Sequence, residues 1–293
     1  MTRTAATLRH LLQGPDLLIM PCCFDGLSAR LIQRAGYPLT FMSGFSVAAA
    51  RLARPDTGLL SYGEILDQGR SILEAVTIPV IGDGDTGYGN AANVERTVEG
   101  FAKAGFAAIM IEDQVAPKRC GHTQGKDVVS RDDAKVRLRA AIRAKEQGAD
   151  ILILARTDAR ATLGFEEAIE RVKMFEDLGA DILFLEAPES IDEMAAFNRA
   201  VALPTMANML EDGLTPYLSP DALHDLGYHI AAYPLTLLSS AVRAMQEALE
   251  QLKKGDRVER RVSFKELQEI VGFKGYDASL ADASSGNVIP RLR

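Results

Sequence analysis

Acidic and polar side chains recur in this chain at one kind of place, the end of a short apolar run that precedes a helical stretch. The residues at these run ends are Ser43, Asp83, Asp85, Glu112, Asp113, Arg156, Asp158, Glu186 and Asn208. Carboxylates outnumber the single arginine in this set, so a site built from them requires a counter-charge. A hard divalent cation, which prefers oxygen ligands, is the simplest counter-charge.

The segment GDGDTGYG carries the strongest indication of a metal site. Asp83 and Asp85 are two residues apart, so both side chains face the same side if the backbone is extended. Glu112 and Asp113 end the next apolar run, and Asp56 lies in the segment ARPDTG. Oxygen-only ligands favour Mg2+ or Mn2+ over zinc. The alternative is a glycine-rich turn whose aspartates are solvated.

The segment KRCGH contains the second candidate for chemistry, the thiol of Cys120. Lys118, Arg119 and His122 stand beside it, and neighbouring cations favour the thiolate. Cys120 is therefore predicted to act as a nucleophile or as an acid–base group. The alternative for a single cysteine is an inert, small hydrophobic side chain.

Arg156 ends an apolar run among these acids. Its planar guanidinium can bind a substrate carboxylate through two parallel hydrogen bonds. The alternative is a structural ion pair with Glu186 or Asp158. Ser43 and Asn208 are suitable hydrogen-bond donors for other substrate oxygens.

Eight apolar runs position these side chains. The runs are LLIMP from Leu17, LTFMSG from Leu39, PVIGDGD from Pro79, AAIMIED from Ala107, DILILARTD from Asp150, DILFLEAP from Asp181, LPTMANM from Leu203 and HIAAYP from His229. They lack the alternation of half-exposed strands, which is typical of buried parallel strands. Helices are predicted between them at about 24–35, 61–76, 90–104, 130–147, 164–178, 190–200, 219–226 and 234–254. This alternation predicts an α/β fold, a (β/α)8 TIM barrel whose active site lies where the strands end.

Two strand-to-helix connections are long, residues 45–60 and 114–129, and long loops at this end of a barrel are usually functional. The barrel is predicted to occupy residues 1–254, followed by a C-terminal helical extension and tail over 255–293. Within that extension, VSFKELQEIVGF is predicted to form a short amphipathic helix. Because its apolar face lies outside a closed barrel, we expect it to contact another subunit.

Bulk properties exclude several classes of protein. The formal net charge is −7 and no basic stripe is present, which disfavours a nucleic-acid partner. No apolar stretch reaches the length of about 18 residues needed to span a membrane, and no signal peptide is recognisable. The three cysteines form no disulfide framework, which suits a cytoplasmic location.

Ordered motifs along nearly the whole chain resemble the isocitrate lyase/phosphoenolpyruvate mutase superfamily, closest to its methylisocitrate lyase, 2,3-dimethylmalate lyase and petal death protein group. The motifs are SGFSVAA at Ser43, PDTG at Pro55, DGDTGYGN at Asp83, KRCGH at Lys118, ARTDA at Ala155, EAP at Glu186 and ANM at Ala207. The resemblance implies a barrel that binds Mg2+ and a 2-oxo acid or its enolate. It also implies a C-terminal helix exchanged between subunits and a homotetramer built as a dimer of dimers.

The resemblance assigns roles to individual residues. Ser43, Gly44, Phe45 and Arg156 would hold the oxo-acid carboxylate, and Asp56, Asp83, Asp85 and Glu112 would organise the metal, with Asp83 and Gly121 also near the substrate. Cys120 would protonate the leaving carbanion, assisted by His122 of the same motif. Glu186 and Asn208 would contact the second product's carboxylate or the proton-transfer network.

The function implied is cleavage of a 2-hydroxy di- or tricarboxylate to a 2-oxo acid such as pyruvate and a second carboxylate. Phe41 replaces the tyrosine and Phe45 the glycine of methylisocitrate lyases, whereas ANMLEDGLTP is closer to the dimethylmalate branch. Pro234 resembles the lyases, where oxaloacetate hydrolases carry serine. The alternatives are an oxaloacetate hydrolase or decarboxylase, a phosphoenolpyruvate or carboxyphosphonoenolpyruvate mutase-like enzyme, and a non-catalytic barrel that binds an oxo acid.

Overall fold

The computed structural model describes residues 3–123 and 125–284. Eight parallel strands form a closed barrel in chain order, and β1 pairs with β8 to complete it. The strands are β1 Leu18–Cys23, β2 Thr40–Met42, β3 Val80–Asp83, β4 Ala108–Glu112, β5 Leu152–Thr157, β6 Ile182–Leu185, β7 Thr205–Asn208 and β8 Ile230–Tyr233. Seven lie within their predicted apolar runs, and β1 begins in the first run and extends two residues past it. The predicted (β/α)8 barrel is therefore confirmed.

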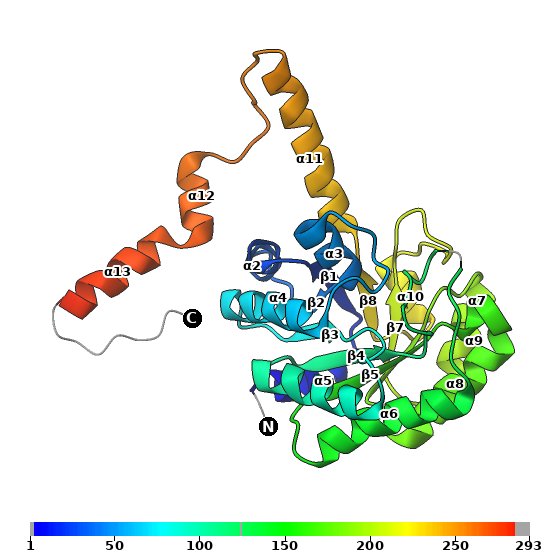
Figure 1. The fold of residues 1–293 in the computed structure, drawn as a ribbon. Coiled ribbons are helices and arrows are strands. Elements are labelled where there is room, and N and C mark those ends of the chain that lie inside the picture. Colours follow the sequence, from blue (N-terminus) through cyan, green and yellow to red (C-terminus); the bar gives the residue numbers. More distant parts are fainter. Residues whose placement is uncertain (1–2, 124, 285–293) are drawn as a thin grey trace.

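Helices follow the strands and surround much of the barrel (Figure 1). They are α1 Arg3–Leu12, α2 Gly26–Arg34, α3 Gly44–Leu52, α4 Tyr62–Ala75, α5 Ala91–Ala104, α6 Arg131–Glu146, α7 Ala159–Leu163, α8 Phe165–Leu178, α9 Ile191–Ala200, α10 Pro220–Asp225, α11 Thr236–Lys253, α12 Phe264–Val271 and α13 Phe273–Ser284. The predicted helix at 130–147 is α6, and Ser130 caps it by accepting a hydrogen bond from the amide of Asp133.

Four helices of the described residues were not predicted. Residues 45–60 were expected to be a loop, but the structure forms α3 over most of the first half of this segment. The run GFSVAAARL is helical because Ser43 caps it, accepting from the amide of Ser46 at 3.3 Å. The helices α1, α7 and α13 also lie outside the predicted set.

Two apolar cores hold the barrel together. One fills the barrel interior, with side chains such as Met20, Ile81 and Leu154. The other lies between strands and helices, where Phe101 and Phe106 stack at 4.6 Å between ring centroids. Leu8 of α1 belongs to the interior core, so α1 closes the amino-terminal end of the barrel and leaves the opposite end for a site.

The last three helices project away from the barrel (Figure 1). No residue of α11 is buried, although its sequence predicted an ordinary eighth barrel helix. The predicted amphipathic helix at 262–273 is confirmed as α12, which contacts the body where Arg30 of α2 donates to the carbonyls of Ile270 and Val271. Within the described part of the chain, no helix is both long and apolar enough to cross a membrane.

Candidate active site

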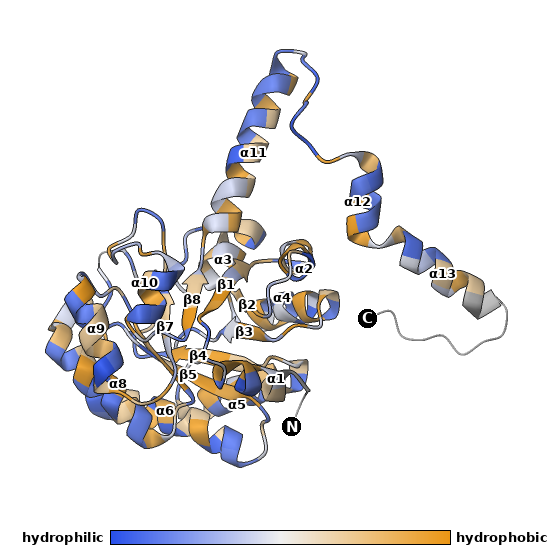
Figure 2. Ribbon diagram, turned by 180° about the vertical axis from the view of Figure 1, so that it is seen from behind, coloured by the Kyte–Doolittle hydropathy of each residue, from blue (hydrophilic) through white to orange (hydrophobic). Residues whose placement is uncertain are grey.

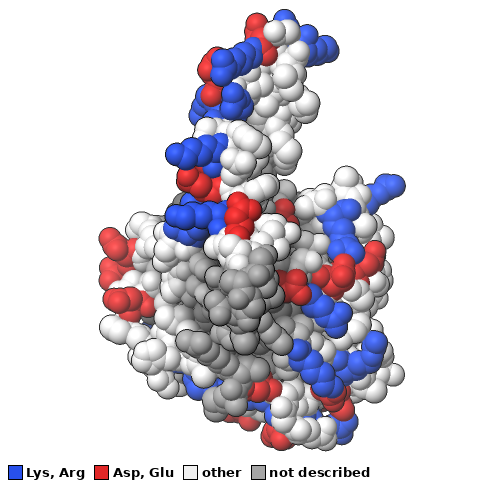
Figure 3. All heavy atoms as spheres, turned by 90° about the vertical axis from the view of Figure 1, so that its left-hand side faces the viewer, with Lys and Arg blue, Asp and Glu red and all other residues white. Residues whose placement is uncertain are grey.

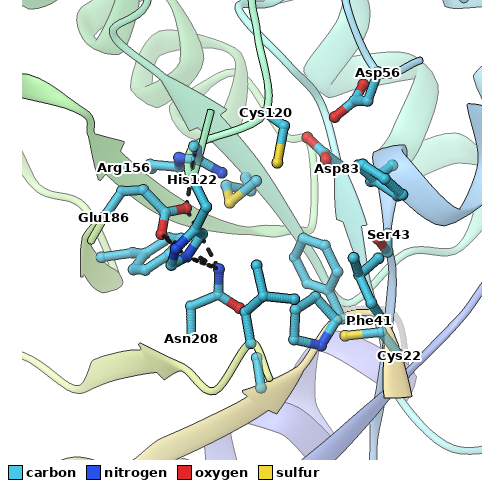
Figure 4. A pocket seen from close by; sticks show the side chains of 18 of the residues that line it. Cys22, Phe41, Ser43, Asp56, Asp83, Cys120, His122, Arg156, Glu186 and Asn208 are labelled. Carbon is cyan, nitrogen blue, oxygen red and sulfur yellow. Dashed lines mark hydrogen bonds and ion pairs between the residues drawn. The ribbon is translucent and has the colours of Figure 1, made fainter. Parts of the chain in front are cut away.

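A pocket opens at the carboxyl end of the barrel strands. Residues predicted for the site that line it are Ser43, Phe45, Asp56, Asp83, Cys120, Gly121, His122, Arg156, Glu186 and Asn208. Figure 4 shows the labelled side chains converging from strand ends and from the loops that follow them, with the Cys120 sulfur between Arg156 and Asp83. The structure therefore brings together residues that are up to 165 positions apart in sequence, from Ser43 to Asn208.

Arg156 is the centre of a buried ion-pair network. Its Nε and Nη2 donate to the carboxylate of Asp158 at 2.8 and 3.0 Å, and Nη2 also lies 3.0 Å from Glu186 Oε2. Its Nε is 3.3 Å from Glu112 Oε2. The structural ion pair of Arg156 with Glu186 or Asp158, which was the alternative to substrate binding, is thus present. These contacts use Nε and Nη2, which leaves Nη1 as the donor that can serve a substrate.

Glu186 joins Arg156 to His122 and Asn208. Its Oε1 lies 3.0 Å from His122 Nε2 and 3.3 Å from Asn208 Nδ2, as the dashed lines in Figure 4 mark. The amide of Leu214 donates to His122 Nδ1, so a neutral imidazole carries its proton on Nε2. Burial alone would raise the pKa of Glu186, but Arg156 and His122 lower it well below its usual range. Glu186 is therefore a fixed anion that orients its neighbours.

Of the carboxylates predicted to hold a metal, Asp83 lies across the pocket from Arg156, as Figure 4 shows, whereas Glu112 contacts Arg156. Asp83 accepts from the amides of Gly44 at 3.1 Å and Asp85 at 3.0 Å. A Cβ on Gly44 would stand 2.5 Å from Asp83 Oδ2, so only glycine permits this approach. Asp85 adopts a left-handed backbone conformation, with φ of 47°, a strain that is common at functional sites.

Lys118 supplies a counter-charge that the sequence analysis did not assign. Its Nζ lies 2.7 Å from Asp56 Oδ1 and 2.9 Å from Asp85 Oδ1. We had expected Arg156 to be the only cation among these acids, and this expectation was wrong. A lysine six residues beyond a strand end gives no sequence signal of the carboxylate it will meet, because the fold of the loop decides its partner.

These acids still fit a divalent cation. Burial, then Asp83 and Asp56, raise the pKa of Asp85 to about 6 against the opposing effect of Lys118, and burial raises that of Glu112 well above its ordinary value. No hydrogen-bond donor among the described residues reaches the buried Glu112 Oε1. Residual negative charge and an unpartnered oxygen are what a hard cation would satisfy. Yet no group of three or more His, Cys, Asp or Glu in residues 3–123 and 125–284 is arranged to hold an ion alone. A cation at this place would therefore need ligands beyond these side chains.

Asp113 takes no part in this carboxylate group, contrary to our expectation. Its Oδ2 accepts from Thr157 Oγ1 at 2.7 Å and from Arg171 Nη1 at 2.9 Å, and its Oδ1 accepts from the amide of Asp158 at 2.9 Å. Arg171 is only 2% exposed. The Asp113 side chain thus points behind the strand ends and supports Asp158, because successive side chains on a strand alternate in direction.

The surroundings of Cys120 favour the protonated thiol over the thiolate that its neighbours in the sequence would favour. Burial raises the pKa of Cys120 above its ordinary value, the amide of His122 opposes this, and the charges of Glu186 and Asp56 raise it further. The lysine and histidine beside it in sequence are engaged with carboxylates. Their positive charges therefore favour the Cys120 thiolate less than their proximity in the sequence suggested. A protonated thiol is suited to give a proton rather than to attack as a nucleophile.

One half of the pocket wall is largely apolar, although Ser43 and Asn208 also line it and Met110 and Phe184 line the other half. Strands β1, β2, β7 and β8 and the segments after them contribute Cys22, Phe41, Phe45, Met206, Leu210, Ala232, Pro234 and Leu235. The charged strand residues come from β3, β5 and the end of β6. Apart from Phe41, Phe45 and Pro234, the apolar residues were not singled out from sequence, since an apolar residue in a barrel strand looks like ordinary core.

Known proteins resemble this chain along nearly all of its length. The family model described as phosphoenolpyruvate phosphomutase matches residues 8–253. The 2,3-dimethylmalate lyase of Eubacterium barkeri is 40% identical over 92% of this chain and 95% of that protein. The 2-methylisocitrate lyase of Aeropyrum pernix is 38% identical over 97% of this chain and 92% of that protein.

Solved structures agree with the sequence matches. Oxaloacetate acetylhydrolase in complex with 3,3-difluorooxalacetate superposes with a TM-score of 0.91 at 36% identity, over 97% of this chain and 98% of that one. A phosphonopyruvate hydrolase complex with oxalate and Mg++ gives 0.84 at 30% identity, over 96% and 99%. A structure of 2,3-dimethylmalate lyase, described as a PEP mutase/isocitrate lyase superfamily member, gives 0.92 at 35% identity, over 98% and 97%. The chain belongs to this superfamily, among relatives that are named as lyases.

Proposed function

We propose that this protein is a divalent-metal-dependent carbon–carbon lyase that cleaves a 2-hydroxy dicarboxylate to a 2-oxo acid and a second carboxylate. One observation carries the proposal. A protonated, pocket-lining thiol on a loop faces a site with buried carboxylates on one side and Arg156 on the other. Such a site can bind two carboxylates, stabilise an enolate and deliver a proton to carbon.

The residues divide the work as follows. Asp83, Asp85 and Glu112, with Asp56 behind them, would hold Mg2+ or Mn2+ chiefly through water. When bound, the metal supplies positive charge to the oxygens of the 2-oxo acid.

Arg156 and the start of α3, with Ser43, Gly44 and Phe45, would hold that acid's carboxylate, because a helix N-terminus binds anions. Breaking the bond next to the hydroxyl carbon leaves an electron pair on the neighbouring carbon, and Cys120 gives that carbon its proton. The hydroxyl proton passes to a pocket carboxylate. Glu186, His122 and Asn208 would orient the departing carboxylate and Arg156.

The apolar half of the pocket favours an alkyl-substituted malate over a tricarboxylate. Lys118, Arg119 and Arg156 line the pocket, but Lys118 and Arg156 are already paired with buried carboxylates, and Arg119 is largely exposed to solvent on the loop. A third carboxylate placed against Phe41, Met206 or Leu235 would find no cation there. Burial of a short alkyl group against these side chains is favourable at about 0.8 kcal/mol per CH2.

The experiment that tests the proposal is a substrate panel. Release of 2-oxo acid would be measured with 2-alkylmalates, 2-methylisocitrate, isocitrate, oxaloacetate and phosphonopyruvate in the presence of Mg2+. The proposal expects the highest kcat/KM with a 2-alkylmalate. Turnover of oxaloacetate or phosphonopyruvate alone would refute it. In favour of the lyase are Cys120 and the absence of a hydroxyl at Pro234.

Of the predicted extension at 255–293, residues 285–293 lie outside the described residues. We also propose that residues 255–284 form an extension beyond the barrel, and that this extension is exchanged between subunits of a homotetramer. Large apolar side chains stand exposed on α11, among them Met245, Leu249 and Leu252, and Phe264 of α12 is 73% exposed. Figure 2 shows apolar bands along α11 and α12, and Figure 3 shows that the charged groups of α11 gather on one edge. A partner subunit would cover such a face. Truncation at residue 255 should yield smaller species in sedimentation, and an unchanged mass would count against the exchange.

A further inference from the structure

Cys120 lies between two main-chain segments that buried side chains hold in place. On its amino-terminal side, Gln114 accepts from the amide of Arg119 at 2.9 Å and donates to the Arg119 carbonyl at 2.8 Å. On its carboxyl-terminal side, Lys126 Nζ donates to the carbonyl of Gly121. The thiol is thus placed by two contacts that do not touch the sulfur.

Lys126 is buried although it is charged, with a side chain that is 3% exposed. Its ammonium also donates to Asp158 Oδ1 at 2.8 Å, and the Asp158 side chain is 0% exposed. A buried lysine is costly unless it is paired and hydrogen-bonded, and both conditions are met here. Lys126 has no role predicted from the sequence, and it is absent from the residues that line the pocket.

Asp158 is a rigid anchor for this contact. Its amide donates to Asp113, and its carboxylate accepts from Arg156, so Asp158 belongs to the framework that fixes the catalytic arginine. Lys126 therefore ties the loop to the same carboxylate that orients Arg156. A movement of the loop is therefore transmitted to Arg156, and a movement of Arg156 to the loop, through the side chain of Asp158.

The peptide that Lys126 holds is pressed against the site. A Cβ on Gly121 would stand 2.4 Å from Arg156 Nη2 and 2.5 Å from Glu186 Oε2. Gly121 also joins Cys120 to His122, so its carbonyl direction sets the course of the main chain between the two side chains. Releasing this carbonyl would let the Cys120 segment lift from the pocket.

We propose that Lys126 is a positioning residue, which holds the segment of Cys120 and Gly121 closed over the pocket by linking the Gly121 carbonyl to Asp158. It touches no substrate, and it acts through the main chain of Gly121. The catalytic consequence rests on the proposed lyase function, whereas the effect on loop closure does not. The two can therefore be tested apart.

The test uses the full-length enzyme and the Lys126→Met variant, which keeps the aliphatic stem and removes the ammonium. Cys22 and Cys23 are 2% and 0% exposed, so an alkylating reagent reports first on Cys120 in the folded protein. We expect Lys126→Met to raise the alkylation rate by about 10-fold, because local opening of the loop exposes the thiol. We expect kcat to fall by a similar factor while KM and Mg2+-dependent oxalate binding change little.

Two further variants keep the test decisive. Lys103→Met removes an exposed lysine on α5, with a side chain that is 77% exposed, and should match the wild type in both measurements. Lys126→Arg keeps the charge beside Asp158, so it folds even if Lys126→Met does not, but a longer planar group cannot reproduce both hydrogen bonds. It should still raise the alkylation rate. Wild-type alkylation rates in the Lys126 variants that fold would overturn the proposal, whatever the substrate of the enzyme proves to be. Faster alkylation without any lyase turnover in the wild type would overturn only the proposed function.

Discussion

The two halves of the pocket differ in how they are built. In the half formed by β3 to β6, charged side chains are buried and each is held by neighbours, as Glu186 is by Arg156, His122 and Asn208. In the half formed by β7, β8, β1 and β2, the wall is packed from apolar side chains such as Phe41 and Met206. The first arrangement fixes charges in defined positions, and the second defines a shape.

This difference indicates a division of labour. Buried charges are costly unless they are paired, so a site keeps them where they stabilise developing charge in the reaction. An apolar wall cannot stabilise an enolate, but it discriminates between substrates by the size and polarity of the group placed against it. We therefore expect changes in the charged half to affect the rate and changes in the apolar half to affect the choice of substrate.

The largest effect should come from the metal-holding carboxylates. Asp85→Ala removes a buried oxygen donor, so we expect loss of Mg2+-dependent turnover, and the wild-type enzyme should lose activity in excess chelator. The measurement is 2-oxo acid release across a Mg2+ titration, with thermal unfolding to verify that the variant is folded. Asp132→Ala, an exposed acid in the first turn of α6, is the matched control. Full activity of the wild-type enzyme in excess chelator would show that the charged half works without a metal.

A smaller but still large effect is expected at Cys120. Cys120→Ser should reduce kcat by roughly 10²-fold or more, the usual scale for loss of a positioned proton donor. Binding of pyruvate with Mg2+ should survive, because its proposed ligands lie on other strands. Cys23→Ala, at a thiol that is 0% exposed and does not line the pocket, serves as the control. Near-normal turnover in Cys120→Ser would make oxaloacetate hydrolysis or decarboxylation the better hypothesis.

The comparison of the halves also explains what the sequence could predict. The charged half was visible because acids such as Asp83 and Glu112 stand at the ends of apolar runs, where a polar residue is conspicuous. The eight strands were equally visible, since each run is a continuous buried segment. The apolar half was largely hidden, because Met206 or Ala232 has the same residue type whether it fills the core or lines a pocket.

Side-chain partners formed the second limit of the sequence analysis. Lys118 was noted as a neighbour of Cys120, yet its ammonium pairs with Asp56 and Asp85. Asp113 follows Glu112 directly, yet it faces Arg171 behind the barrel. Such pairings depend on the conformation of the loop and on the face of the barrel to which a residue at the end of a strand points. The spacing of residues in the sequence determines neither.

A change in the apolar half should alter selectivity more than rate. Phe41 is 6% exposed and stands in the wall. Phe41→Tyr places a hydroxyl there, which should lower kcat/KM for a 2-alkylmalate relative to 2-methylisocitrate by about 10-fold, the scale for a mismatched group in an apolar pocket. Phe165→Tyr, at the start of α8, is the control because it lies outside the pocket. An equal loss of kcat/KM with both substrates would show that Phe41 contributes to the rate. It would then contradict the division between a charged half that sets the rate and an apolar half that selects the substrate.

The smallest effect concerns the protonation of Cys120, which stands between the two halves. Burial raises the pKa of this thiol, and the carboxylate of Glu186 raises it further because a nearby anion disfavours the thiolate. Only the thiolate reacts with iodoacetamide, so alkylation should be slow at neutral pH and should rise about tenfold per pH unit until the raised pKa is passed. Glu186→Gln removes the negative charge, lowers the pKa of Cys120 and should increase the alkylation rate at neutral pH a few-fold, whereas the exposed substitution Asp132→Asn should not. If alkylation of the wild type is already fast and independent of pH near neutrality, Cys120 is a thiolate in the folded enzyme. It could not then supply the proton, and the charged half would act on the substrate without it.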